Sequence, residues 1–290
     1  MNRNRGVKYQ TLIQNLIRFL AFSGLFFFCA CKKNSETDLR PNVNAATDVV
    51  LAESELKFVL DLLLKAEGNT LLWYTGSAEI DSCMVSVDTV KHWIDFQFMD
   101  KWCPDSINRN GLVRVEYSGK FFRKGSTAVI SLINYKVDID NNYSGRDSLV
   151  NTGQDENHAW VFTCAMPDGE ILKTVTGGTT HYSVQGVFMV DSLVSGSFAG
   201  RSWYLKGNID GISSTGTPFS GLISDSLVEN ISCPWIKTGR ITLSVPSAEL
   251  TEGFIDFVDD SECNPAVLFN FGGNEIYIPR LKHYKPGVLY

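Results

Sequence analysis

Hydrophobic and polar residues alternate with a period of two along most of the chain after residue 80. Ile94, Phe96 and Phe98, for example, alternate with single polar residues. Alternation of this kind is typical of β-strands that bury one face and leave the other wetter. The pattern predicts strands at residues 83–87, 94–98, 113–117, 127–138, 159–166, 180–190, 198–208, 219–227, 239–245, 253–258, 266–271 and 275–281.

Turn-forming residues separate most of these segments. Clusters rich in Gly, Asn, Asp and Pro occur at residues 108–111, 138–145, 167–169, 211–216 and 272–274. Many short strands at this spacing predict a mainly β fold, an antiparallel meander folded as a sandwich or a partly closed barrel. Because no Pro/Ser-rich linker interrupts the pattern, residues 47–290 are expected to form a single β-rich domain.

One segment, residues 48–67, has helical periodicity instead. Its apolar residues recur at spacings of three and four, at Ala52, Leu56, Val59, Leu60 and Leu63. This spacing predicts an amphipathic helix with one buried stripe. Thr47 or Asp48 can cap its start. We expect the stripe to pack against the edge or end of the sheet, since a lone amphipathic helix must bury it somewhere.

The N-terminal 30 residues have the pattern of an export signal. Four basic residues and no acid precede an apolar run of twelve residues at 19–30. That run is shorter than the roughly 20 residues that a membrane span requires, so it is interpreted as a cleaved signal peptide, residues 1–30. Ala30 and Cys31 at its end resemble the lipobox of bacterial lipoproteins, although Phe28 and Cys29 depart from that pattern. Processing would leave Cys31 as a lipidated N-terminus; an ordinary secretory signal is the alternative.

Residues 31–46 are polar, contain Pro41 and lack periodicity, which predicts a flexible tether. Lys32 and Lys33 follow Cys31, where an acidic residue would be the familiar signal for retention at the inner membrane. The expected location is therefore the outer membrane, with a periplasmic-facing and a surface-exposed arrangement both open.

Net charge limits the partners. The full chain carries a formal charge of −6, and removing the signal takes away basic residues only. This disfavours nucleic acid, which requires a basic footprint, and it leaves the acyl chains, such as palmitate, as the expected contact with the membrane. No motif indicates a cofactor.

The cysteines that follow Cys31 predict disulfides, which can form outside the cytoplasm. Two units, each with Cys, then IleAspPhe, then Cys, occur around residues 94–96 and 255–257. The repeat favours Cys83–Cys103 and Cys233–Cys263 and leaves Cys164 as a buried free thiol, although sequence alone does not fix the connectivity. A metal site is not expected, because the histidines are scattered and no zinc-ligand spacing occurs.

Short motifs of enzymes are incomplete in this chain. Ser54 and Lys57, with the LysThrGly at 237–239, resemble two motifs of penicillin-recognising serine enzymes, but the SerAspAsn element is missing. A surface Ser and Lys one helical turn apart is the simpler interpretation. Residues 138–142 alternate as calcium ligands do, but Tyr143 replaces the glycine that such a loop needs, so a hairpin turn is predicted. No catalytic residue is assigned.

Residues 52–60, 108–119 and 133–145, with CysProTrpIle at 233–236, resemble a family of uncharacterised lipoproteins of Bacteroidota. The resemblance implies an all-β envelope lipoprotein without an assigned activity. The favoured hypothesis is a non-enzymatic binding or structural module for a glycan, lipid or envelope-protein ligand; the alternative is a hydrolase of envelope or extracellular polysaccharide. The candidate ligand contacts are aromatic residues: Trp93, Trp160, Trp203 and Tyr204.

Overall fold

One long helix and one antiparallel sheet make up the computed structural model, which describes residues 37–191, 202–230, 233, 235–258 and 266–279. The helices are α2 (Arg40–Gly68) and the short α3 (Thr70–Thr75). The strands are β1 (Ser77–Ile80), β2 (Cys83–Asp88), β3 (Trp93–Trp102), β4 (Asn108–Tyr117), β5 (Thr127–Val137), β6 (Asn141–Gln154), β7 (Trp160–Lys173), β8 (Thr179–Val190), β9 (Ser202–Ile212), β10 (Pro218–Asn230), β11 (Thr238–Ser244), β12 (Glu252–Phe257), β13 (Ala266–Phe271) and β14 (Asn274–Pro279). The predicted mainly β meander with an N-terminal helix is confirmed.

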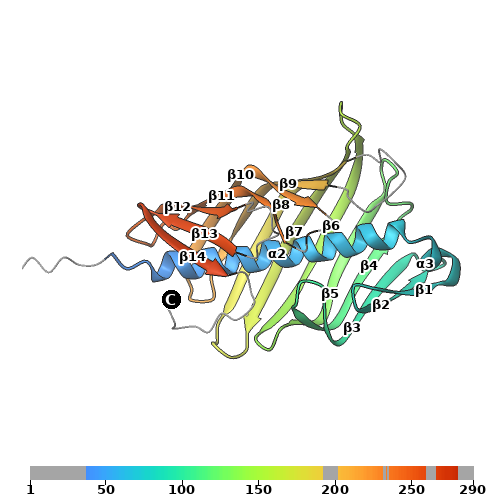
Figure 1. Cartoon of the computed structure of the whole chain (residues 1–290), viewed down its shortest axis with the longest axis horizontal. Helices are drawn as coiled ribbons and strands as arrows, with labels where there is room; N and C mark the ends of the chain where they lie inside the picture. Colours follow the sequence, from blue (N-terminus) through green and yellow to red (C-terminus); the bar gives the residue numbers. More distant parts are fainter. Residues whose placement is uncertain (1–36, 192–201, 231–232, 234, 259–265, 280–290) are drawn as a thin grey trace, which may run out of the picture. The chain divides into compact units, whose positions relative to one another are not determined.

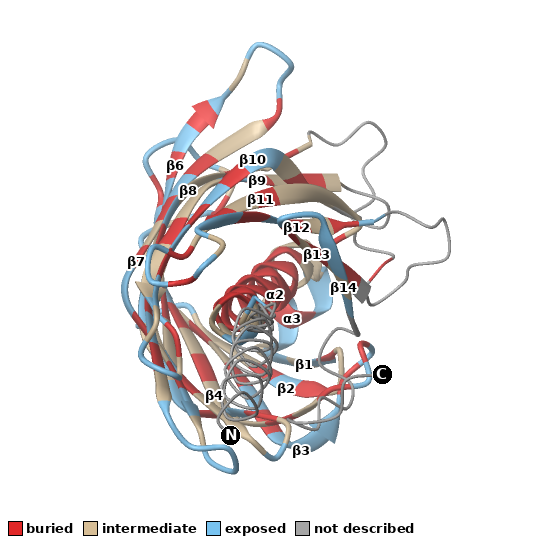
Figure 2. Cartoon of the chain, turned by 90° about the vertical axis from the view of Figure 1, so that its left-hand side faces the viewer, coloured by how far each residue is buried: buried red, intermediate tan, exposed pale blue. Residues whose placement is uncertain are grey.

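The strands follow one another across the sheet in chain order, from β1 to β14. Each pairs antiparallel with its chain neighbours, and the sheet does not close on itself. Asp38–Tyr290 form one compact unit. Within it the sheet curves around α2, which lies along its concave side (Figures 1 and 2).

Helix α2 differs from its prediction in two ways. It begins at Arg40 with Pro41 in its first turn, a favoured position for proline, so the predicted tether is wrong from Arg40 onward. Every residue from Asp48 to Leu64 is also buried, not one stripe alone. The sheet curves around the helix, so residues that the periodicity assigned to a solvated face lie in the interior.

A line of β-bulges bends the sheet across β3 to β7. In β5 the inward positions change from even to odd numbers at Asn134, which has a φ of 49°, so Ile130 and Tyr135 both face α2. Register shifts occur at corresponding places in the pairings of β3 with β4 and β7 with β8. Bulges of this kind bend a strand and re-aim its side chains.

These bulges lie where the sequence predicted turns. Residues 108–111, 138–145 and 167–169 were expected to separate strands, but Gly111, Gly145 and Gly169 all lie inside strands. At Gly111, φ is +111° and a Cβ atom would lie 2.2 Å from the Asn134 carbonyl oxygen, so glycine is required there. Strand β6 was not predicted, because its first residues belong to the segment 138–145 that was expected to be a turn. In the structure only residues 138–140 of that segment form a turn.

The first predicted disulfide is wrong. Cys83 and Cys103 are buried free thiols. Met84 pairs with Gln97, whereas Cys103 follows the end of β3, so register does not place the two cysteines opposite each other. The Cys83 thiol instead donates to the Ile80 carbonyl at 2.9 Å.

The other cysteine predictions have different outcomes. Cys164 is buried and free, as expected. Cys233 is disulfide-bonded. Its predicted partner Cys263 lies outside the described residues, as does Cys31, so Cys233–Cys263 and the lipidation of Cys31 stay predictions.

Candidate functional site

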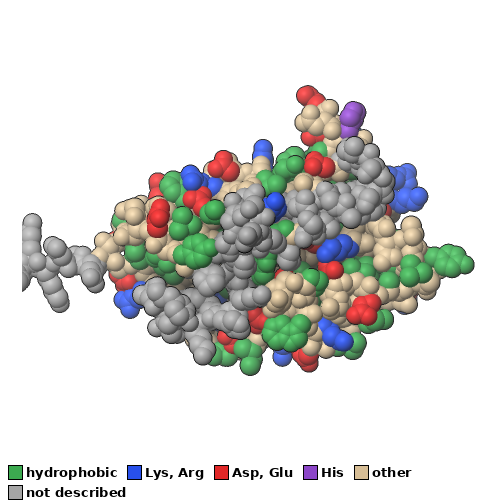
Figure 3. Space-filling model, in the orientation of Figure 1, with side chains coloured by type: hydrophobic (Ala, Val, Ile, Leu, Met, Phe, Trp, Pro, Cys, Tyr) green, Lys and Arg blue, Asp and Glu red, His purple; other side chains and the backbone are tan. Residues whose placement is uncertain are grey.

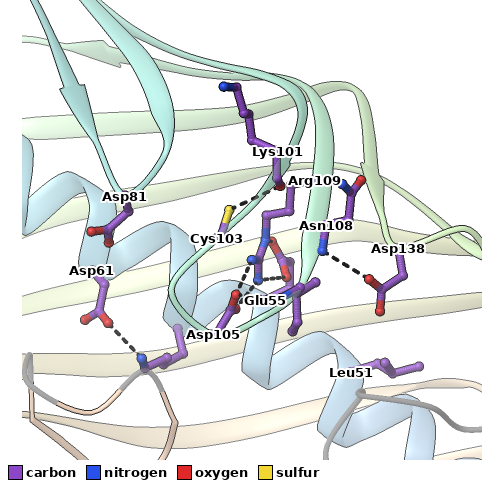
Figure 4. Close-up of polar contacts among 12 residues, drawn as sticks. Leu51, Glu55, Asp61, Asp81, Lys101, Cys103, Asp105, Asn108, Arg109 and Asp138 are labelled. Carbon is purple, nitrogen blue, oxygen red and sulfur yellow. Dashed lines mark hydrogen bonds and ion pairs between the residues drawn. The ribbon is translucent and has the colours of Figure 1, made fainter.

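A buried cluster of polar side chains joins α2 to the start of β4 (Figure 4). Glu55 on α2 accepts hydrogen bonds from Arg109 Nε and Nη2, both at 3.0 Å. Asp105, in the turn before β4, accepts from Arg109 Nη1 at 2.9 Å and Nη2 at 2.7 Å. The Tyr135 hydroxyl donates to Glu55 as well. The guanidinium is thus held by two carboxylates in bidentate geometry.

Burial is nearly complete in this Arg109 cluster, where Arg109 exposes 1% of its surface. Burial alone lowers the pKa of Arg109, but the charges of Glu55 and Asp105 oppose it and raise the pKa well above its usual value. The Phe58 ring lies 3.4 Å from the guanidinium carbon and covers one of its faces. Buried pairs of this kind add little net stability, but they strongly disfavour arrangements that leave one partner unpaired. The cluster therefore fixes the position of α2 relative to β4 and β5.

Two further contacts hold α2 on either side of the Arg109 cluster. Near its C-terminal half, Lys57 Nζ lies 2.8 Å from Asp61 Oδ2, and the Trp203 indole N–H donates to Asp61 Oδ1 at 2.7 Å. Ser54 and Lys57 are buried, so their interpretation as a surface pair is wrong.

Near the N-terminal half, Asp48 pairs with Lys173 on β7 and accepts a hydrogen bond from the Ser214 N–H at 2.7 Å. Asp48 has no exposed surface. Together with the Arg109 cluster, these contacts join α2 to strands or turns at three positions along the helix, near Asp48, Glu55 and Asp61.

A further pair of interior side chains, both carboxylates, has neither a cation nor a hydrogen-bond partner among the described residues. Glu53 on α2 and Asp147 on β6 each expose 1% of their surface, and none of their four carboxylate oxygens has a hydrogen-bond partner. Burial, with a smaller effect of Asp147, raises the pKa of Glu53 to about 8. Burial also raises the pKa of Asp147 to about 7, although the nearby N–H groups of Ser148 and Ala165 oppose the shift.

The opposite surface of the sheet carries an open groove of about 400 Å³ over β7, β8 and β9. Strand alternation turns its polar side chains away from α2, because Tyr182, between His181 and Ser183, points inward. His181 Nδ1 lies 3.1 Å from Glu170 Oε1, and Ser144 donates to Glu170 Oε2 at 3.2 Å. The polar lining of the groove is Asp168, Glu170, His181, Ser183 and Asp210.

The candidate aromatic residues do not form one surface. Trp203 is buried and its N–H is used by Asp61, so as a ligand contact it is wrong. Trp160 packs against Phe122 with ring centroids 5.7 Å apart, at the margin of the core. Tyr204 follows Trp203 in β9, so it points to the outer face, where its hydroxyl donates to Asp191 at 3.3 Å. None of the candidate aromatics lines the groove.

Trp93 belongs to a feature that appears twice. The Arg114 guanidinium lies 4.8 Å from the Trp93 ring centroid and binds Asp95 through two hydrogen bonds of 2.7 Å. The second IleAspPhe unit repeats this arrangement, with Arg240 lying 4.8 Å from the Phe254 ring and bound to Asp256. The sequence repeat therefore has a structural counterpart in cross-strand pairs, although it wrongly predicted the first disulfide.

Sequence reasoning missed the groove and all the interior clusters. The partners of Glu55 are 50 or more residues away along the chain, and Asp147 lies on a strand that was predicted as part turn. Lys57 and Asp61, at i and i+4, were the one readable pair, but that spacing is equally typical of a solvated helix face.

No protein family, curated protein or solved structure matches this chain. Within the described ranges, three or more metal-ligating side chains do not gather at one point. Among the helices that the structure describes, none has the length and apolar character needed to cross a bilayer.

Proposed function

We propose that this protein is an outer-membrane-anchored lipoprotein of the cell envelope and acts as a non-enzymatic binding module for a glycan. The export signal ending at Cys31, the basic residues after it and the resemblance to envelope lipoproteins support the location. The groove over β7, β8 and β9 supports the binding role, and it is the one observation on which that role depends.

The chemistry of the groove favours a hydroxyl-rich ligand. Carboxylates accept hydrogen bonds and an imidazole can both donate and accept them, which suits hydroxyl groups that do both. Glu170, His181 and Asp210 lie on strands in the middle of the sheet, so a ligand would meet positions already set by backbone pairing. The concave side, where a curved sheet could also hold a ligand, is occupied by α2 (Figure 2).

Surface charge is consistent with this choice. On the face drawn in Figure 3, described acidic and basic side chains lie interspersed and are not sorted by sign. The groove itself is lined by three acids and one histidine, which does not favour nucleic acid or anionic lipid, both of which require a basic footprint.

Hydrolysis of polysaccharide is the second candidate, because Asp168, Glu170 and Asp210 line the same groove. A glycoside hydrolase needs one carboxyl that stays protonated near neutral pH, which burial achieves by raising its pKa. The groove does not provide this shielding from water, because Asp168 is exposed and Glu170 and Asp210 are only partly buried. Binding without turnover therefore has the better support.

Binding is tested by titrating the full chain with soluble peptidoglycan fragments and envelope polysaccharides in a calorimeter. His181→Ala and Asp210→Asn should each weaken binding by about tenfold or more, equivalent to about 1.4 kcal/mol. The control Glu116→Gln changes an exposed acid on β4 and should leave affinity unchanged. Wild-type affinity in all three variants would show that the groove is not the binding site. Release of shorter sugars during the titration would favour the hydrolase.

Anchoring is tested separately. Mass spectrometry of the membrane fraction should find an acylated Cys31 as the first residue, and Cys31→Ala should remain unprocessed or leave the membrane. A soluble product that begins at another residue would contradict the anchor without affecting the groove.

A further inference from the structure

Within the described residues, Glu53 and Asp147 are buried acids that have no ion pair with a cation. Their four oxygens are buried without a hydrogen-bond partner. An unpaired ionised carboxylate is very costly in a protein interior, so such a group takes up a proton instead. Because the two carboxyls also interact with each other, ionising one makes ionising the second harder.

The cations of the interior are engaged elsewhere. Arg109 binds Glu55 and Asp105, Lys57 pairs with Asp61, and Lys173 pairs with Asp48. Within the described residues, the charged group that acts on Glu53 is Asp147, another acid.

The other titratable groups around the pair come from β7, β8 and α2. Cys164 on β7 and Tyr182 on β8 both interact with Glu53 and Asp147. Burial raises the pKa of each, so both stay neutral, and neither side chain can carry a positive charge. Glu55 on α2 also acts on Tyr182, but it is held by Arg109. The surroundings therefore favour the neutral forms of Glu53 and Asp147.

The space beside Asp147 argues against a bound metal ion. Asp147 lines an interior cavity of about 20 Å³ together with Tyr143 and Tyr182. That volume has room for one water molecule and not for a hydrated cation.

We propose that Glu53 and Asp147 form a proton-binding pair that holds α2 against the sheet while protonated and weakens this contact when both carboxyls ionise. The pair connects α2 to β6, so its ionisation acts directly on the contact between helix and sheet. The protein thereby contains a pH-sensitive element that does not depend on the groove or on any ligand.

The sign of the effect follows from proton linkage. Unfolded Asp and Glu titrate near pH 4, whereas folded Asp147 titrates near pH 7 and Glu53 near pH 8. The folded state holds more protons between these limits, so its stability falls as pH rises. Each extra proton changes the unfolding equilibrium constant by about tenfold per pH unit. The pair should therefore raise that constant by about 100-fold from pH 6 to 7 and about tenfold from pH 7 to 8.

The test is urea unfolding of the full chain at pH 6, 7 and 8. Glu53→Gln and Asp147→Asn should each remove about a tenfold change per pH unit over the range in which that carboxyl titrates. The control Glu252→Gln replaces an exposed acid on β12 and should keep the wild-type pH dependence. Working above pH 6 limits the contribution of Glu67, whose pKa burial raises to about 6.

Two results would overturn the proposal. One is a pH dependence that is the same in wild type, Glu53→Gln and Asp147→Asn. The other is stabilisation of the wild type by 10 mM CaCl₂ at pH 8 that Glu53→Gln abolishes, which would identify a cation site. Should Glu53→Gln not fold, Asp147→Asn and the wild-type pH dependence still decide the matter.

Discussion

Glu53 and Glu55 lie two residues apart on α2, about 200° apart around the helix, and meet opposite environments. Glu55 faces Arg109 and Tyr135 and has its charge matched by a bidentate guanidinium. Glu53 is instead influenced by the charge of Asp147, and neither carboxyl has a hydrogen-bond partner. Both glutamates are almost fully buried, so the difference lies in the partners and not in exposure.

The contrast separates two uses of a buried acid. A matched acid fixes position, because a shift of α2 would leave Glu55, Asp105 or Arg109 buried and unpaired. An unmatched acid makes the same helix contact depend on pH, because its neutral form is the one that fits. The three matched contacts along α2 can therefore fix the position of the helix, while the unmatched pair makes the strength of the contact between helix and sheet depend on pH.

The largest expected effect comes from breaking the matched side. Arg109→Met leaves Glu55 and Asp105 buried without a cation and should lower the free energy of unfolding by about 3–5 kcal/mol, measured in urea at pH 7. The control Arg146→Met removes a pair with Glu116 whose side chains are 65% and 54% exposed, and should cost about 0–1 kcal/mol. Equal losses in the two variants would contradict the role of the Arg109 cluster.

A smaller loss is expected at the next contact along α2. Trp203→Phe keeps an aromatic ring but removes the donor to Asp61, and should lower the free energy of unfolding by about 1.5–3 kcal/mol. Tyr204→Phe, at the next residue but on the outer face, should stay within about 0.5 kcal/mol of wild type. A ligand-binding defect in Trp203→Phe without loss of stability would instead revive Trp203 as a ligand contact.

The unmatched side should respond in the opposite direction. At pH 8, Asp147→Asn should raise the free energy of unfolding by about 1–3 kcal/mol, because it removes a buried charge at the cost of an amide without partners. At pH 5 the gain should shrink or change sign, since the folded-state pKa of Asp147 is about 7 and the wild-type carboxyl is already neutral. Destabilisation of equal size at both pH values would indicate that Asp147 acts through packing alone.

The sequence predicted the sheet because alternation survives in every strand with a continuous hydrophobic face, such as β12. It failed where Gly111, Asn134 and Gly145 bend strands, because bulges use the same residue types as turns. The helix was found, but its solvated face was assumed. Whether Glu55 contacts Arg109 or solvent depends on how the sheet curves. The spacing of residues along α2 does not predict that curvature.

The most direct test of the account is a carboxyl titration by NMR on the full chain with ¹³C-labelled Asp and Glu side chains, assigned with Glu53→Gln and Asp147→Asn. Asp147 should titrate near pH 7 and Glu53 near pH 8, both far above the values near 4 of unperturbed carboxyls. Titration of both groups near pH 4 would show that the pair is charged in the folded protein, and would contradict the claim that its neutral form holds α2 against the sheet.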